Sequence, residues 1–284
     1  MKSYSEKLRA FSAAHPCGRV TAAGASFRYV LCGAGERTLV LLNGGMNTLE
    51  MWMDYVDDLA RDSRVLLFDY PRELKTNQAQ AAGMHALFET LGIQKPIFVG
   101  ASDGGMVAQI YVQKYPGETG GLVLISTGGM DERTLRSLKK KYRLAPLMLW
   151  YMKHCNYEKL KPRLIRASLS HLRNESPEEI AYARDMFETI FRDYPQEKDV
   201  HISTLLADLM NQKPVTAADF SALAGKILLI LPDQDFFSGE MQQDLIGLMH
   251  QPKIVCASGG HLGTVLKAED DLRAIRAFLQ EAEL

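Results

Sequence analysis

Residues 98–109 read FVGASDGGMVAQ and join a buried-looking apolar run to a helix-like segment. Within this stretch Ser102 stands between Gly100 and Gly104, so one hydroxyl is flanked by residues that have no Cβ. Gly and Ser are ordinary turn residues, and a plain turn is one interpretation. The other is a turn too tight for larger residues that exposes a nucleophilic serine. Such a nucleophile needs a base, an acid and oxyanion donors elsewhere in the chain.

Apolar runs alternate with helix-like segments along the first half of the chain. Two short runs around a glycine turn predict a hairpin, at 19–24 and 25–33. Continuous apolar runs predict strands buried on both faces, at 38–45, 64–71, 95–102 and 121–129. The segments between these strands predict helices, at 49–62, 81–92 and 105–117.

The alternation lapses over residues 130–213, which are helical in character and contain no convincing strand. It resumes afterwards with strands at 226–235 and 252–261 and with helices near 239–250 and 264–283. The sequence therefore predicts an α/β fold in which helices flank a mostly parallel central sheet. Residues 1–129 and 214–284 form the predicted core, and residues 130–213 form a helical cap or lid inserted into it.

Reactive side chains follow several of the predicted strands, at the point where each strand ends. These residues are Asn43, Gly44, Gly45 and Met46, then Ser102 and Asp103, then Asp233, Gln234 and Asp235, and finally His261. Parallel sheets present their sites at the carboxyl ends of the strands. A hydroxyl, a carboxylate and an imidazole, in the chain order Ser, Asp, His, are therefore expected to share one crevice.

At this point the sequence resembles a known family. Residues 100–104 form G-x-S-x-G after a strand and before a helix, which is the context of a nucleophile elbow. Together with V-x-A-x-G-x-S-F-R-Y at 20–29, L-P-D-Q-D at 231–235 and G-G-H at 259–261, the motif resembles the α/β-hydrolase fold superfamily. The resemblance is to its capped esterases, lactonases and proline-iminopeptidase-like enzymes. It covers nearly the whole chain outside the cap.

The resemblance implies a catalytic triad and an oxyanion hole. Ser102 would attack a carbonyl carbon, His261 would take its proton and later protonate the leaving group, and Asp235 would hold the imidazole. The backbone N–H groups of Asp103 and Gly45 would bind the oxyanion, with Met46 as the alternate to Gly45. Such a triad is self-sufficient, so neither a metal nor an organic cofactor is expected.

Two of these roles have competitors in the sequence. Asp233 lies two residues from Asp235, and Asp131 would serve a variant acid position after the preceding strand. The other histidines lie in the N-terminal segment or in helix-like stretches, namely His15, His85, His154, His171, His201 and His250. Some members of the superfamily use an aspartate nucleophile, but the two glycines flank Ser102 rather than Asp103, which disfavours that chemistry.

The chain departs from the family pattern in two places. The strand to the oxyanion loop commonly ends in His-Gly, whereas here Asn43 and Gly44 stand there, so the hydrogen bonds of the loop must differ. The segment RELKTNQAQAAG at 72–83 replaces a longer Gly-rich loop and reshapes one wall of the pocket. The cap is rich in Leu, Met, Trp and Phe, which mildly favours a small-molecule substrate with an apolar acyl or aromatic group.

Composition excludes several classes of protein. Lys and Arg number 33 and Asp and Glu 34 among 284 residues, so the basic excess of a nucleic-acid binder is absent. The N-terminus lacks the apolar core of a signal peptide, and the longest apolar stretch, 144–152, is too short to span a membrane. Four scattered cysteines predict reduced, buried thiols, and together these features predict a cytoplasmic protein.

These observations favour a serine hydrolase acting on a small carboxylic ester, lactone or thioester. A C–C bond hydrolase, an aminopeptidase or an acyltransferase on the same triad is the alternative. An aminopeptidase would need cap carboxylates for a free amine, and Glu175, Glu178 and Glu179 are the candidates, although S-P-E-E equally begins a helix. A non-catalytic ligand-binding protein remains a further alternative, since the fold alone permits it.

Overall fold

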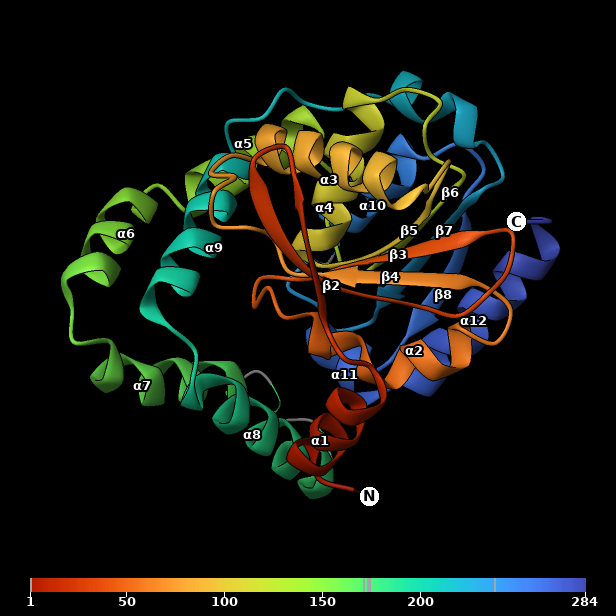
Figure 1. Ribbon diagram of the computed structural model, residues 1–284. Coiled ribbons are helices and arrows are strands. Elements are labelled where there is room, and N and C mark those ends of the chain that lie inside the picture. Colours follow the sequence, from red (N-terminus) through yellow and green to blue (C-terminus); the bar gives the residue numbers. More distant parts are fainter. Residues whose placement is uncertain (1, 171, 173–174, 238) are drawn as a thin grey trace.

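A computed structural model of the chain describes residues 2–170, 172, 175–237 and 239–284. Its centre is an eight-stranded sheet in the order β1-β2-β4-β3-β5-β6-β7-β8 (Figure 1). The strands are β1 (Gly18–Ala22), β2 (Ala25–Cys32), β3 (Thr38–Leu42), β4 (Arg64–Phe68), β5 (Ile97–Ala101), β6 (Gly121–Ile125), β7 (Ile227–Pro232) and β8 (Lys253–Ala257). β1 and β2 run antiparallel to their neighbours, and the pairs from β4 to β8 are parallel.

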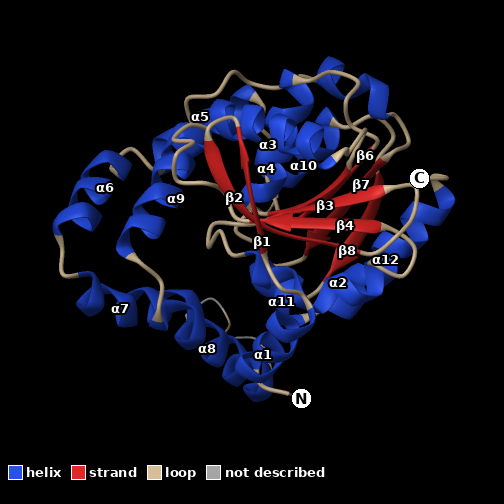
Figure 2. Cartoon of the chain, in the orientation of Figure 1, coloured by secondary structure: helices blue, strands red, loops and turns tan. Residues whose placement is uncertain are grey.

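Helices cover both faces of this sheet (Figure 2). One face packs against α3 (Asn77–Leu91), α4 (Asp103–Lys114) and α10 (Glu240–Leu248). The other packs against η1 (Leu49–Trp52), α2 (Met53–Leu59), α12 (Ala268–Glu281) and the N-terminal α1 (Tyr4–Ala14). Successive side chains of a strand point to opposite faces, so Val40 and Leu42 enter the first core whereas Leu39 and Leu41 enter the second. The apolar strands are therefore buried on both sides, which confirms the predicted mostly parallel α/β architecture.

Among the described residues, five α-helices lie between β6 and β7 in the chain. They are α5 (Glu132–Lys141), α6 (Ala145–His154), α7 (Tyr157–Leu169), α8 (Pro177–Arg192) and α9 (Gln196–Leu209). In Figure 1 α6, α7 and α9 lie to the left of the sheet, with α6 outermost and α9 between α6 and the strands, and α8 lies below the sheet towards α1. The 3-10 helix η2 (Ala217–Leu223) then leads into β7, and η3 (Gly260–Leu262) and α11 (Gly263–Leu266) follow β8.

Several local expectations differ from the structure. The helix α1 was not anticipated, although Ser3 and Glu6 form a reciprocal capping box at its start. The helix predicted at 49–62 begins as a 3-10 turn and ends at Leu59. The cysteines are free, but the prediction that they are buried is wrong, because Cys32 and Cys155 are only half-buried and the other two are exposed. Cys17 is exposed in the connection from α1 to β1, and Cys256 is exposed on the edge strand β8, which presents alternate side chains to solvent.

Candidate active site

Ser102 occupies a strained turn between β5 and α4. Its backbone has φ +53° and ψ −120°, a conformation that residues with a side chain seldom adopt. The turn is anchored because the Ser102 N–H donates to the carbonyl of Ile125 at 2.9 Å, and the Thr127 hydroxyl donates to the Ser102 carbonyl at 2.6 Å. The strain is thus held by the neighbouring strand β6 and the residues just beyond it.

The glycines on either side of Ser102 are required by close backbone approaches. A Cβ at Gly100 would lie 2.6 Å from the Gly104 carbonyl oxygen, and one at Gly104 would lie 2.2 Å from the Leu42 carbonyl oxygen. Both distances are far below a van der Waals contact, so any side chain here would push α4 away from β3 and β5. The G-x-S-x-G spacing is therefore explained by packing around the turn.

His261 and Asp235 lie in line with the serine. The Ser102 hydroxyl oxygen is 3.0 Å from His261 Nε2, and His261 Nδ1 is 2.6 Å from Asp235 Oδ1. Asp235 follows β7 and its side chain is fully buried, whereas the His261 side chain, in η3 after β8, is 35% exposed. The N–H of Phe237 also donates to Asp235 Oδ1, at 3.3 Å. The structure thus brings together the three side chains that the strand ends suggested.

The competing residues lie elsewhere or have other contacts. Asp233 is exposed after β7, and Asp131 caps α5, where its Oδ1 accepts the Thr134 N–H at 2.9 Å. His15, His85, His154 and His250 contact Asp57, Tyr111, the Trp150 carbonyl and the Ala217 carbonyl, respectively. His171 lies outside the described residues. Of the acidic candidates for an amine site, Glu179 caps α8 with Ser176 and forms an ion pair with Lys267.

A turn at residues 44–47 approaches the serine from β3. The Asn47 N–H donates to the Gly44 carbonyl at 2.9 Å, and a Cβ placed on Gly44 would lie 3.5 Å from the Ser102 Cβ. Within the described part of the chain, the backbone N–H groups of Gly45, Met46 and Asp103 donate to no protein acceptor. Three uncommitted donors therefore stand on the turn and at the start of α4.

A buried polar network holds this turn. Asn47 Oδ1 accepts the Tyr70 N–H at 2.7 Å, and Asn47 Nδ2 donates to the Tyr70 carbonyl at 3.0 Å. Asn43 Nδ2 donates to the Phe68 carbonyl at 2.7 Å, and the Tyr70 hydroxyl donates to the Asn43 carbonyl at 3.1 Å. Asn43 thus uses its amide to tie β3 to the end of β4, which accounts for its presence where the family pattern has histidine.

Tyr194, just before α9, and Leu206, within α9, also lie close to the turn. The Tyr194 hydroxyl, just before α9, donates to the Met46 carbonyl at 2.7 Å, and a Cβ on Gly45 would lie 3.8 Å from Leu206 of α9. Burial raises the pKa of Tyr194, so its hydroxyl remains a donor at neutral pH. Sequence reasoning missed Tyr194, Asn47 and Tyr70, because their partners are backbone carbonyls and N–H groups that no motif records.

The side chain of Asp103, the residue that follows Ser102, is buried. The residue is 3% exposed, and neither carboxyl oxygen has a hydrogen-bond partner among the described residues. Burial raises the pKa of Asp103 to about 7, since the charged form has lost its water without gaining a donor. Asp103 therefore combines a backbone N–H near the serine with a side chain that is largely protonated below neutral pH.

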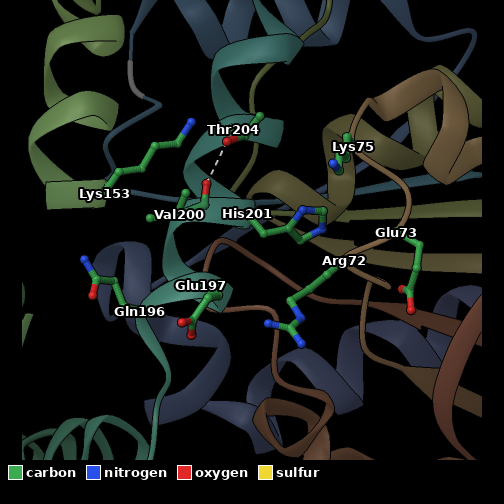
Figure 3. Close-up of a pocket in the computed structure, with 9 residues that line it drawn as sticks. All are labelled: Arg72, Glu73, Lys75, Lys153, Gln196, Glu197, Val200, His201 and Thr204. Atoms are coloured by element: carbon green, nitrogen blue, oxygen red, sulfur yellow. Dashed lines mark hydrogen bonds between the residues drawn. The ribbon is translucent and has the colours of Figure 1, made fainter.

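A cavity of about 850 Å³ opens beside the helices, and none of its lining residues belongs to the Ser102, His261 and Asp235 set (Figure 3). The residues lining it are Arg72, Glu73, Lys75, Lys153, Gln196, Glu197, Val200, His201 and Thr204. They come from the loop after β4 and from α6 and α9. Burial and the nearby Arg72 lower the pKa of His201, whose Nε2 is buried without a partner in the described chain.

No helix among the described residues is long and apolar enough to cross a membrane.

Known proteins are similar to parts of this sequence. The 2-hydroxy-6-oxononadienedioate/2-hydroxy-6-oxononatrienedioate hydrolase of Paraburkholderia phymatum is 34% identical over 115 residues, covering 35% of this chain and 40% of that protein. The pimeloyl-[acyl-carrier protein] methyl ester esterase of Edwardsiella ictaluri is 29% identical over 99 residues, covering 34% of this chain and 38% of that protein. The matches thus span about two fifths of the relatives' own lengths.

Solved structures are similar over nearly the whole chain. A thermophilic esterase from Thermogutta terrifontis has a TM-score of 0.70 at 20% identity, covering 94% of this chain and 99% of that one. The enol-lactonase from Burkholderia xenovorans has a TM-score of 0.73 at 16% identity, covering 93% and 100%. Residues 37–167 match the sequence profile of the family described as the alpha/beta hydrolase fold. With the strand order and the serine turn, these matches show that the chain has the alpha/beta hydrolase fold.

Proposed function

We propose that this chain is a serine hydrolase that cleaves a small carboxylic ester, lactone or thioester through an acyl-enzyme on Ser102. The observation that carries the proposal is the continuous line from the Ser102 hydroxyl through His261 to the buried carboxylate of Asp235, with contacts of 3.0 and 2.6 Å. A serine hydroxyl is a weak nucleophile at neutral pH and needs such a base. A plain turn would not require this alignment.

The chemistry follows from these positions. His261 Nε2 accepts the Ser102 proton as the oxygen attacks the carbonyl carbon, and Asp235 fixes the tautomer in which His261 Nδ1 carries the proton. His261 then protonates the leaving group, and a water activated by the same imidazole hydrolyses the acyl-enzyme. The oxyanion accepts hydrogen bonds from the backbone of Asp103 and of Gly45, or Met46 in its place, whose N–H groups are uncommitted.

We further propose that residues 130–213 serve as the cap over this site and that the protein is cytoplasmic. Contacts of Tyr194 and Leu206 with the turn at 44–47 support the cap assignment. Apolar side chains near His261, with Phe236 and Phe237 ring centroids at 6.3 and 5.9 Å from the imidazole, support an apolar acyl or aromatic substrate.

The test compares the wild-type protein with Ser102→Ala. We expect a fluorophosphonate probe to label the wild type only, and short-chain to medium-chain p-nitrophenyl esters to be turned over by the wild type only. Loss of turnover should be at least about 10³-fold, since the variant keeps the oxyanion donors but no nucleophile. Absence of labelling in the folded wild type would overturn the proposal and favour a ligand-binding protein.

A second candidate is a C–C bond hydrolase, and the names of the curated relatives favour it. Two of them are hydrolases of 2-hydroxy-6-oxo dienoate and trienoate diacids, at 34% and 30% identity. The same Ser102 and His261 pair would serve this reaction. Bleaching of a coloured 2-hydroxy-6-oxo dienoate by wild type but not Ser102→Ala, with negligible ester turnover, would decide for this alternative.

A further inference from the structure

Large exposed apolar side chains gather on one short segment. Nine such side chains are exposed in the described residues, and six of them fall within residues 142–151. These six are Tyr142, Leu144, Leu147, Met148, Trp150 and Tyr151, and Phe236 adds a seventh because its ring stacks on Tyr142 at 6.3 Å between centroids. We refer to these seven side chains as the apolar face. Contiguous patches of this kind are rare on free protein surfaces and mark sites of interaction.

The packing of α6 explains why these side chains remain exposed. Met152 is the one residue of α6 that is buried, and the helix lies against α9, which separates it from the sheet (Figure 1). Trp150 and Leu147 are 59% and 61% exposed. Since neither the core nor α9 covers these side chains, their exposure carries a hydrophobic cost that a partner surface would relieve.

The segment that carries most of the apolar face is also positively charged. Residues 133–157 contain seven Lys or Arg and no Asp or Glu. Arg133 and Arg136 pair with acidic side chains of α10 and α5, and the Lys141 ammonium lies 3.7 Å from the Phe236 ring centroid. Lys139, Lys140, Arg143 and Lys153 form no ion pair with any described residue. These cations match a surface that is both apolar and anionic.

We propose that the apolar face, with the lysines at 139–141, docks on the surface of an anionic phospholipid bilayer. In this arrangement α6 lies in the plane of the headgroups, Trp150 and its apolar neighbours enter the acyl boundary, and the lysines contact lipid phosphates. Each lysine near such a surface is attracted to the anionic headgroups, so charge and burial act together. Phe236 borders His261, so docking brings the mouth of the serine site to the lipid. The binding itself does not depend on the proposed catalytic activity.

The test uses co-sedimentation with phospholipid vesicles. The full chain carrying Ser102→Ala is mixed with vesicles of phosphatidylcholine alone or with 30% phosphatidylglycerol, in low and high salt. We expect binding to the anionic vesicles that weakens in high salt and is at least about tenfold weaker on the neutral ones. Because this variant lacks the candidate nucleophile, the outcome is separate from that of the activity test.

Matched variants locate the surface. Leu147→Glu with Trp150→Glu should reduce binding at least about tenfold. Ile254→Glu, which alters a side chain of 44% exposure on the edge strand β8, should bind as the parent does. Lys139→Glu with Lys140→Glu should reduce binding to anionic vesicles, whereas Lys95→Glu with Lys226→Glu, at the amino ends of β5 and β7, should not. Circular dichroism and thermal melting are the controls that test whether each variant is folded.

Three results would overturn the proposal. One is the absence of vesicle binding by the folded parent, and another is an equal loss in the Ile254→Glu control. The third is a concentration-dependent dimer, seen by analytical ultracentrifugation without lipid, that Leu147→Glu with Trp150→Glu dissociates while vesicle binding is absent. That result would make the apolar face an interface between two copies of the chain.

Discussion

At the scale of single residues, the serine turn is maintained by the absence of side chains around it. The backbone of Ser102 adopts a φ of +53°, and its neighbours Gly100 and Gly104 meet backbone atoms at 2.6 and 2.2 Å if given a Cβ. Strain of this kind costs about 1–3 kcal/mol and persists only where the surroundings impose it. The turn is therefore sensitive to small additions of volume.

Gly104→Ala should destabilise the protein by several kcal/mol, because its new Cβ collides with the Leu42 carbonyl, which cannot move without disturbing β3. Gly247→Ala is the matched control. It lies inside α10 with nothing within 4 Å of its Cβ, and it should stabilise the protein by about 0.5–1 kcal/mol through helix propensity. Urea unfolding of both variants measures this, and equal effects would refute the steric account.

The raised pKa of the buried Asp103 carboxyl predicts an unusual dependence of the protein's stability on pH. Its pKa is raised from 3.8 to about 7, so between these values the folded state binds the proton that the unfolded state has released. Stability contributed by this group is thus present at low pH and falls as the pH rises towards 7. Asp103→Asn removes the free-energy cost of ionising this buried carboxyl group. The stability of the variant relative to wild type should therefore increase by on the order of 2 kcal/mol between pH 5 and pH 8.

Urea unfolding at the two pH values measures this difference. Asp233→Asn, an exposed carboxylate after β7, is the control and should show the same stability difference from wild type at both pH values. A stability change in Asp103→Asn that does not vary with pH would mean that the Asp103 carboxyl titrates normally in the folded protein.

At the scale of elements, the turn at 44–47 is held from two sides. β4 and Tyr70 hold it from the sheet through Asn43 and Asn47, and the start of α9 holds it through the Tyr194 hydroxyl. The peptide that accepts from Tyr194 directly follows the N–H groups proposed as oxyanion donors. The position of α9 should therefore affect turnover more than substrate binding.

Tyr194→Phe should lower kcat about fivefold and leave KM nearly unchanged, since one neutral hydrogen bond contributes about 1 kcal/mol and the donors act in the transition state. Steady-state kinetics on the best ester substrate measures this. Tyr157→Phe is the control, because that hydroxyl donates to Asp199 and not to the turn. A rise in KM at constant kcat would show instead that Tyr194 affects ground-state binding.

The sequence predicts elements better than the contacts between them. Continuous apolar runs such as TLVLL and KILLILP predict buried parallel strands because both of their faces need cover, and the structure confirms this sheet. Ser102, Asp235 and His261 follow from reading the residues just after those runs. The sequence leaves Asp233 and Asp131 open beside Asp235 as the proposed acid, because the path of the loop after a strand decides which carboxyl group reaches His261.

Other features of the structure cannot be predicted from the residues next to them in the sequence. Tyr194 resembles any aromatic residue at a helix boundary, and its role depends on how α9 docks against β3. The Asp103 carboxyl is buried, although an acidic residue in the first turn of a helix is ordinarily exposed. The start of α1, in contrast, has a sequence signal, which is the capping box formed by Ser3 and Glu6.

At the scale of the whole molecule, α1 links the α5–α9 helices to the sheet domain. The Ser5 N–H donates to Asp185 of α8 at 2.9 Å, and Lys7 pairs with Asp54 of α2 at 2.8 Å. Tyr4 is 1% exposed and packs edge-on against Tyr182 at 5.9 Å between ring centroids. One short helix thus holds the middle of α8 close to α2.

Tyr4→Ala should cost about 3–4 kcal/mol and loosen α8, because it leaves a cavity where an aromatic ring was buried. Tyr4→Phe removes only a hydroxyl that has no partner among the described residues, and it should be neutral or slightly stabilising. Limited proteolysis followed by mass spectrometry should find faster cleavage within 130–213 in Tyr4→Ala alone. Unchanged cleavage would show that α1 does not restrain these helices.

The contact between α1 and α8 also has a consequence for synthesis. Ser5 and Asp185 are 180 residues apart in the chain. At ribosomal rates of about 5–20 residues per second, α1 is complete roughly 10–35 s before its partner helix has been made. During this interval Tyr4 has no Tyr182 to pack against, so a nascent chain of this protein exposes the apolar side of α1 until α8 emerges.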